Sequence, residues 1–228
     1  MSDVAGVLLA AGQGRRLGGP KALVEVGGEL LVEGATRTLR EAGCRPVIVV
    51  LGAGGPRVRA RARLGDALVL DNPAWEEGMG SSLRVALDAL GEYEHLGAVA
   101  IALVDQPGVG PSAVTRLTAA WRAGALIAVA GYAGRRGNPV VLDRSLWAAA
   151  AAHAVGDRGA RDLLDARPDI VRLVPCEDVA DPTDLDTPEE LEAAQHRWPV
   201  RGAAGDRSAT DRPSAEGSAE GSRRQRCS

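Results

Sequence analysis

The chain alternates short apolar runs with segments whose apolar residues recur at helical spacing. Residues 4–10, 46–51 and 98–104 are rich in Val, Ile, Leu and Ala, as buried parallel strands are. Between them, residues 29–42 and 81–90 carry their apolar side chains on one helical face. Such a chain buries both kinds of segment as a mostly parallel sheet with helices on both faces, so we expect an α/β fold. Sheets of this kind bind ligands beyond the carboxyl ends of their strands.

The same alternation continues to the end of the apolar part of the chain. A last helix is expected after Thr187, because Pro188 suits the first helical position and Glu190 completes a capping box. We therefore expect one domain over residues 1–198. Its remaining elements are strands at 67–70, 126–130, 139–142 and 170–174, and helices at 57–64, 112–122, 144–154 and 159–166.

The composition changes after this domain. Residues 199–228 are rich in Gly, Ala, Ser, Asp and Arg, repeat Ser-Ala-Glu-Gly twice, and contain no Leu or Ile. Such a segment cannot bury enough apolar surface to offset the entropy lost on ordering. We expect a disordered low-complexity tail over residues 199–228.

Charge and composition exclude several classes of partner. The chain has 27 basic and 30 acidic residues and no Phe, so a basic or aromatic nucleic-acid surface is not expected. No apolar run is long enough to cross a membrane. The three Cys, at positions 44, 176 and 227, have neither metal-ligand nor disulfide-framework spacing. We expect a cytoplasmic protein that binds neither nucleic acid nor membrane.

A glycine-rich loop follows the first predicted strand. Residues 8–21 read Leu-Leu-Ala-Ala-Gly-Gln-Gly-Arg-Arg-Leu-Gly-Gly-Pro-Lys, so a strand runs into a loop with three cations. Glycines let backbone N–H groups approach phosphates closely, and the cations would neutralise phosphate charge. The spacing fits neither a Walker loop nor a dinucleotide fingerprint. Lys21 is the one lysine among 27 basic residues. The alternative interpretation is a plain turn with solvated arginines.

Acidic residues at two places could hold a metal ion. Asp105 stands directly after the strand over residues 98–104, and Mg²⁺ prefers one or two carboxylates together with phosphate oxygens. Asp184 and Asp186 are two residues apart, so on an extended segment they share one side. The alternatives are a turn Asp before Pro and acidic residues that stabilise the following helix N-terminus.

Three further segments combine glycine with polar or basic residues. Residues 78–84, Gly-Met-Gly-Ser-Ser-Leu-Arg, could contact a nucleotide at a helix entry or could form an ordinary Ser cap. Residues 135–139 and 156–161, Arg-Arg-Gly-Asn-Pro and Gly-Asp-Arg-Gly-Ala-Arg, are predicted loops that could bind an anionic second substrate. Solvated loops are the equally simple interpretation.

In this order along the chain, these segments together resemble the molybdenum cofactor cytidylyltransferases, within the MobA-like nucleotidyltransferases. The resemblance spans about residues 4–195 and includes the Asp-Gln-Pro triplet and the Asp-Thr-Pro-Glu segment. It implies a Rossmann-like nucleotidyltransferase fold. It also implies transfer of CMP from CTP to the terminal phosphate of molybdopterin, with release of pyrophosphate, and a molybdoenzyme or its chaperone as a further partner.

The resemblance also implies the site residues. Arg16, Lys21 and Asp105 would be catalytic, Asp105 and Asp186 would bind Mg²⁺, and the role of Asp184 stays open. The acceptor would contact Asn138, Gly156, Asp157 and Arg161. The nucleotide would contact Leu9, Ala10, Ala11, Gly12, Gly14, Arg15, Arg16, Gly18, Lys21, Asn72, Gly80, Ser81 and Ser82.

Three alternatives to this function remain. One is a guanylyltransferase of the same fold that uses GTP, although the Asp-Gln-Pro triplet differs from the Cys-Asp-x-Pro pattern of that branch. Another is a nucleotidyltransferase that acts on a sugar or another phosphate. The third is a non-catalytic nucleotide-binding protein, which the presence of both Lys21 and Asp105 argues against.

Overall fold

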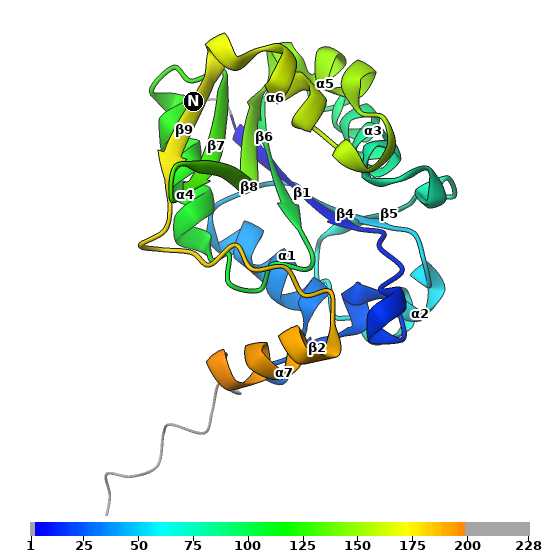
Figure 1. Ribbon diagram of the computed structural model, residues 1–228. Coiled ribbons are helices and arrows are strands. Elements are labelled where there is room, and N and C mark those ends of the chain that lie inside the picture. Colours follow the sequence, from blue (N-terminus) through cyan, green and yellow to red (C-terminus); the bar gives the residue numbers. More distant parts are fainter. Residues whose placement is uncertain (1–2, 199–228) are drawn as a thin grey trace, which may run out of the picture.

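A computed structural model of the chain describes residues 3–198, so the predicted tail over 199–228 lies outside the described residues. Seven strands form one sheet in the order β5-β4-β1-β6-β8-β7-β9, and only β8 runs antiparallel to its neighbours (Figure 1). The strands are β1 (Asp3–Ala10), β4 (Val47–Leu51), β5 (Leu68–Asp71), β6 (Leu96–Leu103), β7 (Ile127–Tyr132), β8 (Arg135–Asp143) and β9 (Val171–Pro175).

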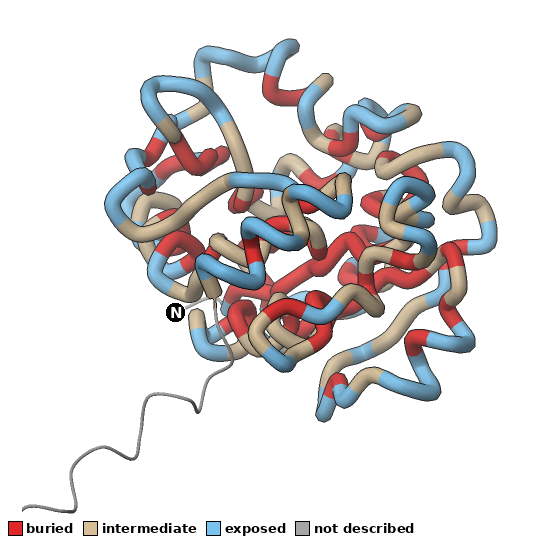
Figure 2. Tube along the Cα trace, turned by 60° about the horizontal axis from the view of Figure 1, so that its bottom comes forward, coloured by how far each residue is buried: buried red, intermediate tan, exposed pale blue. Residues whose placement is uncertain are grey.

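The side chains of each strand alternate between the two faces of the sheet, and both faces are apolar. Helices therefore cover both faces and form a core on each. Leu8 of β1 packs in one core, together with α1 (Leu31–Glu41), α2 (Gly55–Arg61) and α4 (Pro111–Arg122). Leu9 packs in the other, with α3 (Met79–Leu90), α5 (Trp147–His153) and α6 (Arg161–Ala166). Figure 2 shows the buried residues concentrated along the central strands. The expected α/β fold with a mostly parallel sheet is confirmed.

The order of the strands reverses direction between β1 and β6. From β1 the chain continues outward to β4 and β5 on one side, and β6 then starts the other side. The two strands are parallel, with Leu9 opposite Leu103, so their carboxyl ends lie level at one edge. Loops diverge at such a point and leave room for a ligand. The glycine loop and Asp105 both follow these strand ends.

Two predicted elements differ from the structure. A short hairpin of β2 (Glu25–Val26) and β3 (Glu29–Leu30) precedes α1, so the helix begins at Leu31 rather than at Glu29. Strands of two residues show no alternation, so no periodic pattern marks them. The predicted loop over 135–138 is the first part of β8, and the turn lies at Ala133–Gly134 instead. Its exposed arginines pair with β7 where the hairpin extends beyond the core, so no apolar pattern marks it.

The other predicted elements are present with shifted ends. The segments after β8 begin with single turns, η4 (Arg144–Leu146) before α5 and η5 (Gly156–Arg158) before α6. The last helix, α7 (Pro188–Arg197), begins where its capping box predicts. Within residues 3–198, no helix is long and apolar enough to cross a membrane. The remaining single turns are η1 (Arg15–Leu17), η2 (Lys21–Leu23), η3 (Trp75–Glu77) and η6 (Pro168–Ile170).

Candidate active site

Three segments that are distant in the sequence meet beyond the ends of β1 and β6. They are the glycine loop, the loop that starts at Val104, and residues 181–187 before α7 (Figure 1). Next to them lies a cavity of about 510 Å³. Seven predicted site residues line it, namely Leu9, Ala11, Gly12, Arg15, Lys21, Ser82 and Asp105, and the predicted acceptor residue Asp157 lines it as well.

The glycine loop turns back on itself over η1. Gly14 has φ 59°, and a Cβ there would lie 2.2 Å from the carbonyl oxygen of Gly19, so only glycine fits. Gly18 also has a positive φ, 77°. The turn leaves the side chains of Arg15 and Arg16 exposed, and Arg15 donates a hydrogen bond to Gln13. Of the two guanidinium groups only that of Arg15 lines the cavity, while the charge of Arg16 acts on Asp186. The predicted residues Gly14 and Gly18 do not line this cavity.

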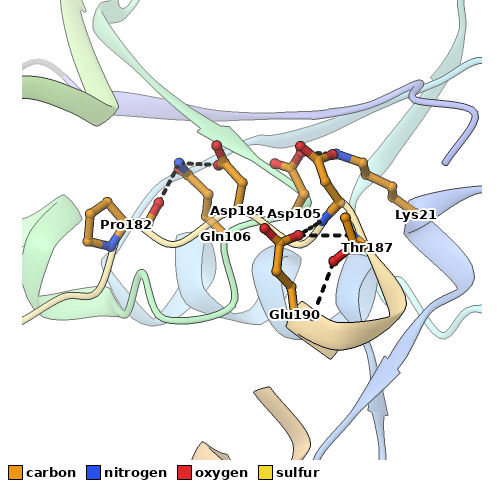
Figure 3. Close-up of polar contacts among 8 residues, drawn as sticks. Lys21, Asp105, Gln106, Pro182, Asp184, Thr187 and Glu190 are labelled. Carbon is orange, nitrogen blue, oxygen red and sulfur yellow. Dashed lines mark hydrogen bonds and ion pairs between the residues drawn. The ribbon is translucent and has the colours of Figure 1, made fainter. Parts of the chain in front are cut away.

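Lys21 connects the glycine loop to the acidic residues. Its side chain passes close to the loop, since a Cβ on Gly14 would lie 3.1 Å from Lys21 Cγ. Its Nζ lies 2.5 Å from Oδ2 of Asp105 and 2.5 Å from Oδ1 of Asp186 (Figure 3). Burial would lower the pKa of the Lys21 ammonium, but the two carboxylates outweigh this effect and hold the pKa above its ordinary value. Lys21 stays charged.

The two carboxylates on Lys21 converge on one point. Two oxygens that each lie 2.5 Å from the same nitrogen are at most about 5 Å apart. The hydrogen bond from Lys21 lowers the pKa of Asp186 below its ordinary range. Carboxylates that converge on a cation fit Mg²⁺, which needs only one or two of them when phosphate oxygens complete its shell. Within residues 3–198 no cluster of three or more His, Cys, Asp or Glu is placed to hold a metal ion.

Asp184 has different partners. Its Oδ1 accepts a hydrogen bond of 2.8 Å from Nε2 of Gln106, which lies 3.2 Å from the carbonyl oxygen of Pro182 as well (Figure 3). Burial, and after it the charge of Asp105, raises the pKa of the Asp184 carboxyl. The backbone N–H of Leu185 also donates to the carbonyl of Asp105, at 2.9 Å. These bonds fix the segment that carries Asp186 against the loop that carries Asp105.

The start of α7 fixes Asp186 from its other side. The Oε2 atom of Glu190 accepts hydrogen bonds from the backbone N–H groups of Asp186, at 2.8 Å, and of Thr187, at 2.9 Å. The Thr187 hydroxyl in turn accepts from the N–H of Glu190 (Figure 3). The predicted capping box is confirmed, and it also orients the backbone of a predicted metal ligand.

Three residues predicted to contact the nucleotide form hydrogen bonds that stabilise the turn before α3. Asn72 is buried and donates to the hydroxyls of Ser81, at 2.7 Å, and Ser82, at 3.0 Å. The Ser81 hydroxyl also lies 2.8 Å from the carbonyl of Gly78. Of these predicted contacts only Ser82 lines the cavity. Asn72, Gly80 and Ser81 do not, and neither does the buried Ala10.

A second cavity of about 190 Å³ adjoins the first. Leu9, Met79 and Leu103 line both of them. Its other walls are apolar side chains of β6, α3, β8 and α6, while Asn138 and Arg161 bring in the polar groups predicted to contact the acceptor. Arg136, Arg158 and Asp165 line the second cavity as well, so both cavities combine apolar and charged side chains, and they meet at the tip of β1.

Close packing on two glycines holds η5 beside both cavities. A Cβ on Gly78 would lie 2.6 Å from Oδ1 of Asp157 and 2.4 Å from the carbonyl carbon of Gly156. A Cβ on Gly80 would lie 2.5 Å from the carbonyl oxygen of Ala154. The glycines predicted to approach a nucleotide therefore let α3 approach this backbone. Gly156 packs on Gly78, and Asp157 faces the first cavity.

Several residues of the site were not predicted from the sequence, among them an aromatic, an acidic and an amide side chain. Trp75 and Glu76 line the first cavity beside the glycine loop, and Gln106 joins the acidic segments. The signal for Trp75 is its rarity, because the chain has four Trp and no Phe. Gln106 stood beside Asp105 in the motif, but its partners lie 76 and 78 residues further along the chain.

Comparison with known proteins gives the following similarities. The model of the family described as MobA-like NTP transferase domain matches residues 6–171. The nicotine blue oxidoreductase of Paenarthrobacter nicotinovorans is 42% identical over 196 residues, which cover 82% of this chain and 94% of that protein. A probable molybdenum cofactor guanylyltransferase of Opitutus terrae is 35% identical over 109 residues, 47% of this chain and 50% of that one.

A solved structure is similar over nearly the whole described chain. The crystal structure of the Mycobacterium tuberculosis H37Rv protein Rv0371c in complex with manganese has a TM-score of 0.72 and 27% identity. The match covers 86% of this chain and 99% of that one.

Proposed function

The chain belongs to the MobA-like NTP transferase domain family, and from this premise we propose that it transfers CMP from CTP to the terminal phosphate of a molybdopterin-type acceptor. Nucleotidyl transfer is the reaction class of the family. The observation that carries the proposal is the convergence of Lys21, Asp105 and Asp186 beside a glycine loop. In nucleotidyl transfer the protein supplies position and charge, and this arrangement offers both.

The residues of the chain have separable tasks in this reaction. The glycine loop and its two arginines would bind the triphosphate. Lys21 would neutralise charge that develops on the leaving pyrophosphate, in a place where its side chain is only 15% exposed. An oxygen of the acceptor phosphate attacks the α-phosphorus of CTP, and the bond from that phosphorus to the bridging oxygen of the β-phosphate breaks. No side-chain nucleophile is needed.

A divalent cation completes the electrostatics of the proposed site. Asp105 and Asp186 would hold Mg²⁺, which would screen the repulsion between the two phosphates and polarise the α-phosphate. The manganese complex of Rv0371c, a protein of the same architecture, supports the use of a divalent ion. Gln106 and Glu190 would keep the two carboxylates in place.

The second cavity would take the acceptor. Asn138 and Arg161 line it, and it joins the first cavity at Leu9, Met79 and Leu103. An acceptor there would have its reactive phosphate near the nucleotide. The choice of molybdopterin rests on the resemblance of the motifs, and the similarity to a probable molybdenum cofactor guanylyltransferase supports it.

Oxidoreduction is a second candidate, favoured by the 42% identity to the nicotine blue oxidoreductase. The apolar part of the second cavity would take a flat compound of another kind as well as a pterin. The two candidates differ in what is consumed. A nucleotidyltransferase releases pyrophosphate from CTP, whereas an oxidoreductase oxidises an electron donor such as a reduced nicotinamide dinucleotide and leaves CTP intact.

Thermal unfolding with CTP, GTP, ATP and UTP, each with Mg²⁺, tests the nucleotide. A ligand present at 100 times its dissociation constant adds about 2.7 kcal/mol, so we expect the largest shift with CTP. A larger shift with GTP would replace CMP transfer by GMP transfer and leave the reaction class standing.

Pyrophosphate release from CTP in the presence of molybdopterin tests the reaction, and the Asp105→Asn variant is the control. Donor oxidation with nicotine blue and no pyrophosphate release would support oxidoreduction instead.

A further inference from the structure

The second cavity has a basic rim around apolar walls. Leu83, Ile101, Val140 and Leu164 line its interior. Its polar lining comes from Asn138 and from three arginines with one carboxylate, namely Arg136 of β8, Arg158 of η5, Arg161 of α6 and Asp165 of α6. An apolar slot with an excess of guanidinium groups fits a flat ligand that carries an anionic group.

One carboxylate, that of Asp165, forms ion pairs with two of these arginines. Oδ1 of Asp165 lies 3.1 Å from Arg136, and its Oδ2 lies 2.7 Å from Arg158. Asp165 thus bridges β8 and η5, and Arg158 also pairs with Asp162 of α6. The Asp165 side chain is 58% exposed, so water screens both ion pairs and each is weak. Arg161 has no ion-pair partner within residues 3–198.

We propose that Asp165 is an internal counter-ion, which holds Arg136 and Arg158 until the anionic group of a flat, largely apolar acceptor displaces it. The inference rests on the proposed function and deepens it by naming the class of acceptor. A phosphate or carboxylate can bind both guanidinium groups through paired oxygens, as Asp165 does. A ligand without such a group would gain nothing from these arginines, so Asp165 makes the cavity select for charge.

A purely structural role for Asp165 makes a different prediction. If its ion pairs only fix β8 and η5, removing the carboxylate loosens the cavity and weakens every ligand alike. If it competes with the ligand, removing it strengthens anionic ligands and leaves neutral ones unchanged. A charged and a neutral compound with the same ring therefore separate the two roles.

The test is a fluorescence titration of the full chain without nucleotide. Pterin-6-carboxylate serves as the anionic probe and unsubstituted pterin as the neutral one. Exposed ion pairs are worth up to about a fivefold change in an equilibrium constant, so we expect Asp165→Asn to bind pterin-6-carboxylate about two- to fivefold more tightly. Binding of neutral pterin should not change. Arg136→Gln should weaken pterin-6-carboxylate alone.

Asp169→Asn is the matched control, because Asp169 pairs with Arg167 and neither residue lines the cavity. It should bind both probes as the unmodified chain does. The proposal is overturned if Asp165→Asn binds the anionic probe equally or less tightly, if both probes change together, or if the unmodified chain binds neither probe. The titration needs no CTP, so a failure of CMP transfer leaves its result standing, and the reverse also holds.

Discussion

The ammonium of Lys21 lies 2.5 Å from the carboxylate of Asp105, although 84 residues separate them in the sequence. Asp186, 165 residues from Lys21, contacts the same ammonium at 2.5 Å. A lysine predicted to contact phosphates is therefore also the counter-ion of both predicted metal ligands. The cation that a nucleotide brings and this ammonium would compete for the same oxygens.

Replacing Lys21 by Arg should impair catalysis although the charge is kept. The side chain is confined, because Gly14 leaves it little room and two carboxylates meet its single nitrogen. A guanidinium is broader and would push the carboxylates apart. Loss of one well-placed cation costs on the order of 3 kcal/mol of transition-state stabilisation, about a hundredfold in rate. We expect Lys21→Ala to lose most of this and Lys21→Arg a substantial part.

Steady-state kinetics of pyrophosphate release from CTP measure the effect. Arg122→Lys, an exchange at the exposed last residue of α4 and outside the lining of both cavities, is the control and should keep normal kcat/KM. Unchanged kcat/KM in Lys21→Arg would mean that the single lysine of the chain has no special role.

Replacing Asp105 by Asn should abolish turnover and leave the fold intact. The residue follows the end of β6, where its carboxylate faces Lys21 rather than the core. The variant keeps the shape of the side chain but loses one of the two carboxylates for the metal. Binding of Mn²⁺ with nucleotide, followed by electron paramagnetic resonance, should weaken with the activity, while circular dichroism stays the same.

Glu76→Gln is the control, which tests whether the loss of any acidic side chain from the first cavity weakens metal binding. Glu76 lines that cavity but is exposed. The variant should bind Mn²⁺ normally. Ordinary turnover in Asp105→Asn at ordinary Mg²⁺ would remove Asp105 from the metal site.

The sequence predicts the sheet better than it predicts the site. Apolar runs such as 46–51 indicate strands because burial on both faces leaves no polar position, and the paired strand ends follow from that. The neighbourhood of Lys21, Asp105 and Asp186 depends instead on contacts such as Gln106 with Asp184, between segments far apart in the chain. No local pattern encodes such a contact.

The roles of short polar motifs could not be predicted from the sequence either. Ser81 after two glycines fits a phosphate contact and a buried support of a turn equally well, and only the packed structure shows its bond to Asn72. The hairpin of β2 and β3 escaped because its strands have two residues each. Both failures concern segments too short to show a periodic pattern.

Replacing Gly80 by Ala should destabilise the fold. The new Cβ would lie 2.5 Å from the backbone carbonyl of Ala154, so α3 or the segment after α5 must move. Overpacking of this kind costs about 1–3 kcal/mol. Gly19→Ala is the control, because nothing lies within 4 Å of a Cβ there, and it should change the free energy of unfolding by less than about 0.5 kcal/mol. Denaturant melts give both values, and equal stability of the two variants would contradict the packing argument.

Asp143 should stabilise the protein in a pH-dependent way. Its carboxylate accepts hydrogen bonds from Trp121 Nε1, at 2.8 Å, and from the backbone N–H and the hydroxyl of Ser145, at 3.0 and 2.6 Å. Burial would raise the pKa of Asp143, but these bonds outweigh it and hold the pKa below its ordinary value. The folded state therefore favours the ionised form.

A carboxyl whose pKa is lower in the folded state contributes stability above its unfolded pKa, which is about 3.9. It loses that contribution as the pH falls through the folded value.

Because hydrogen bonds to charged groups are worth about 1.5–3 kcal/mol each when buried, and this site is only partly buried, we expect Asp143→Asn to lose about 1–2 kcal/mol of unfolding free energy at pH 7. The difference from the unmodified chain should shrink steadily below about pH 4. Urea melts at pH 7, 5, 4 and 3 measure it. Glu94→Gln, at an exposed loop position before β6, should show no difference at any pH. A deficit of Asp143→Asn that stays constant down to pH 3 would mean that the charge of Asp143 contributes nothing, and that its hydrogen bonds stabilise the protonated and ionised forms alike.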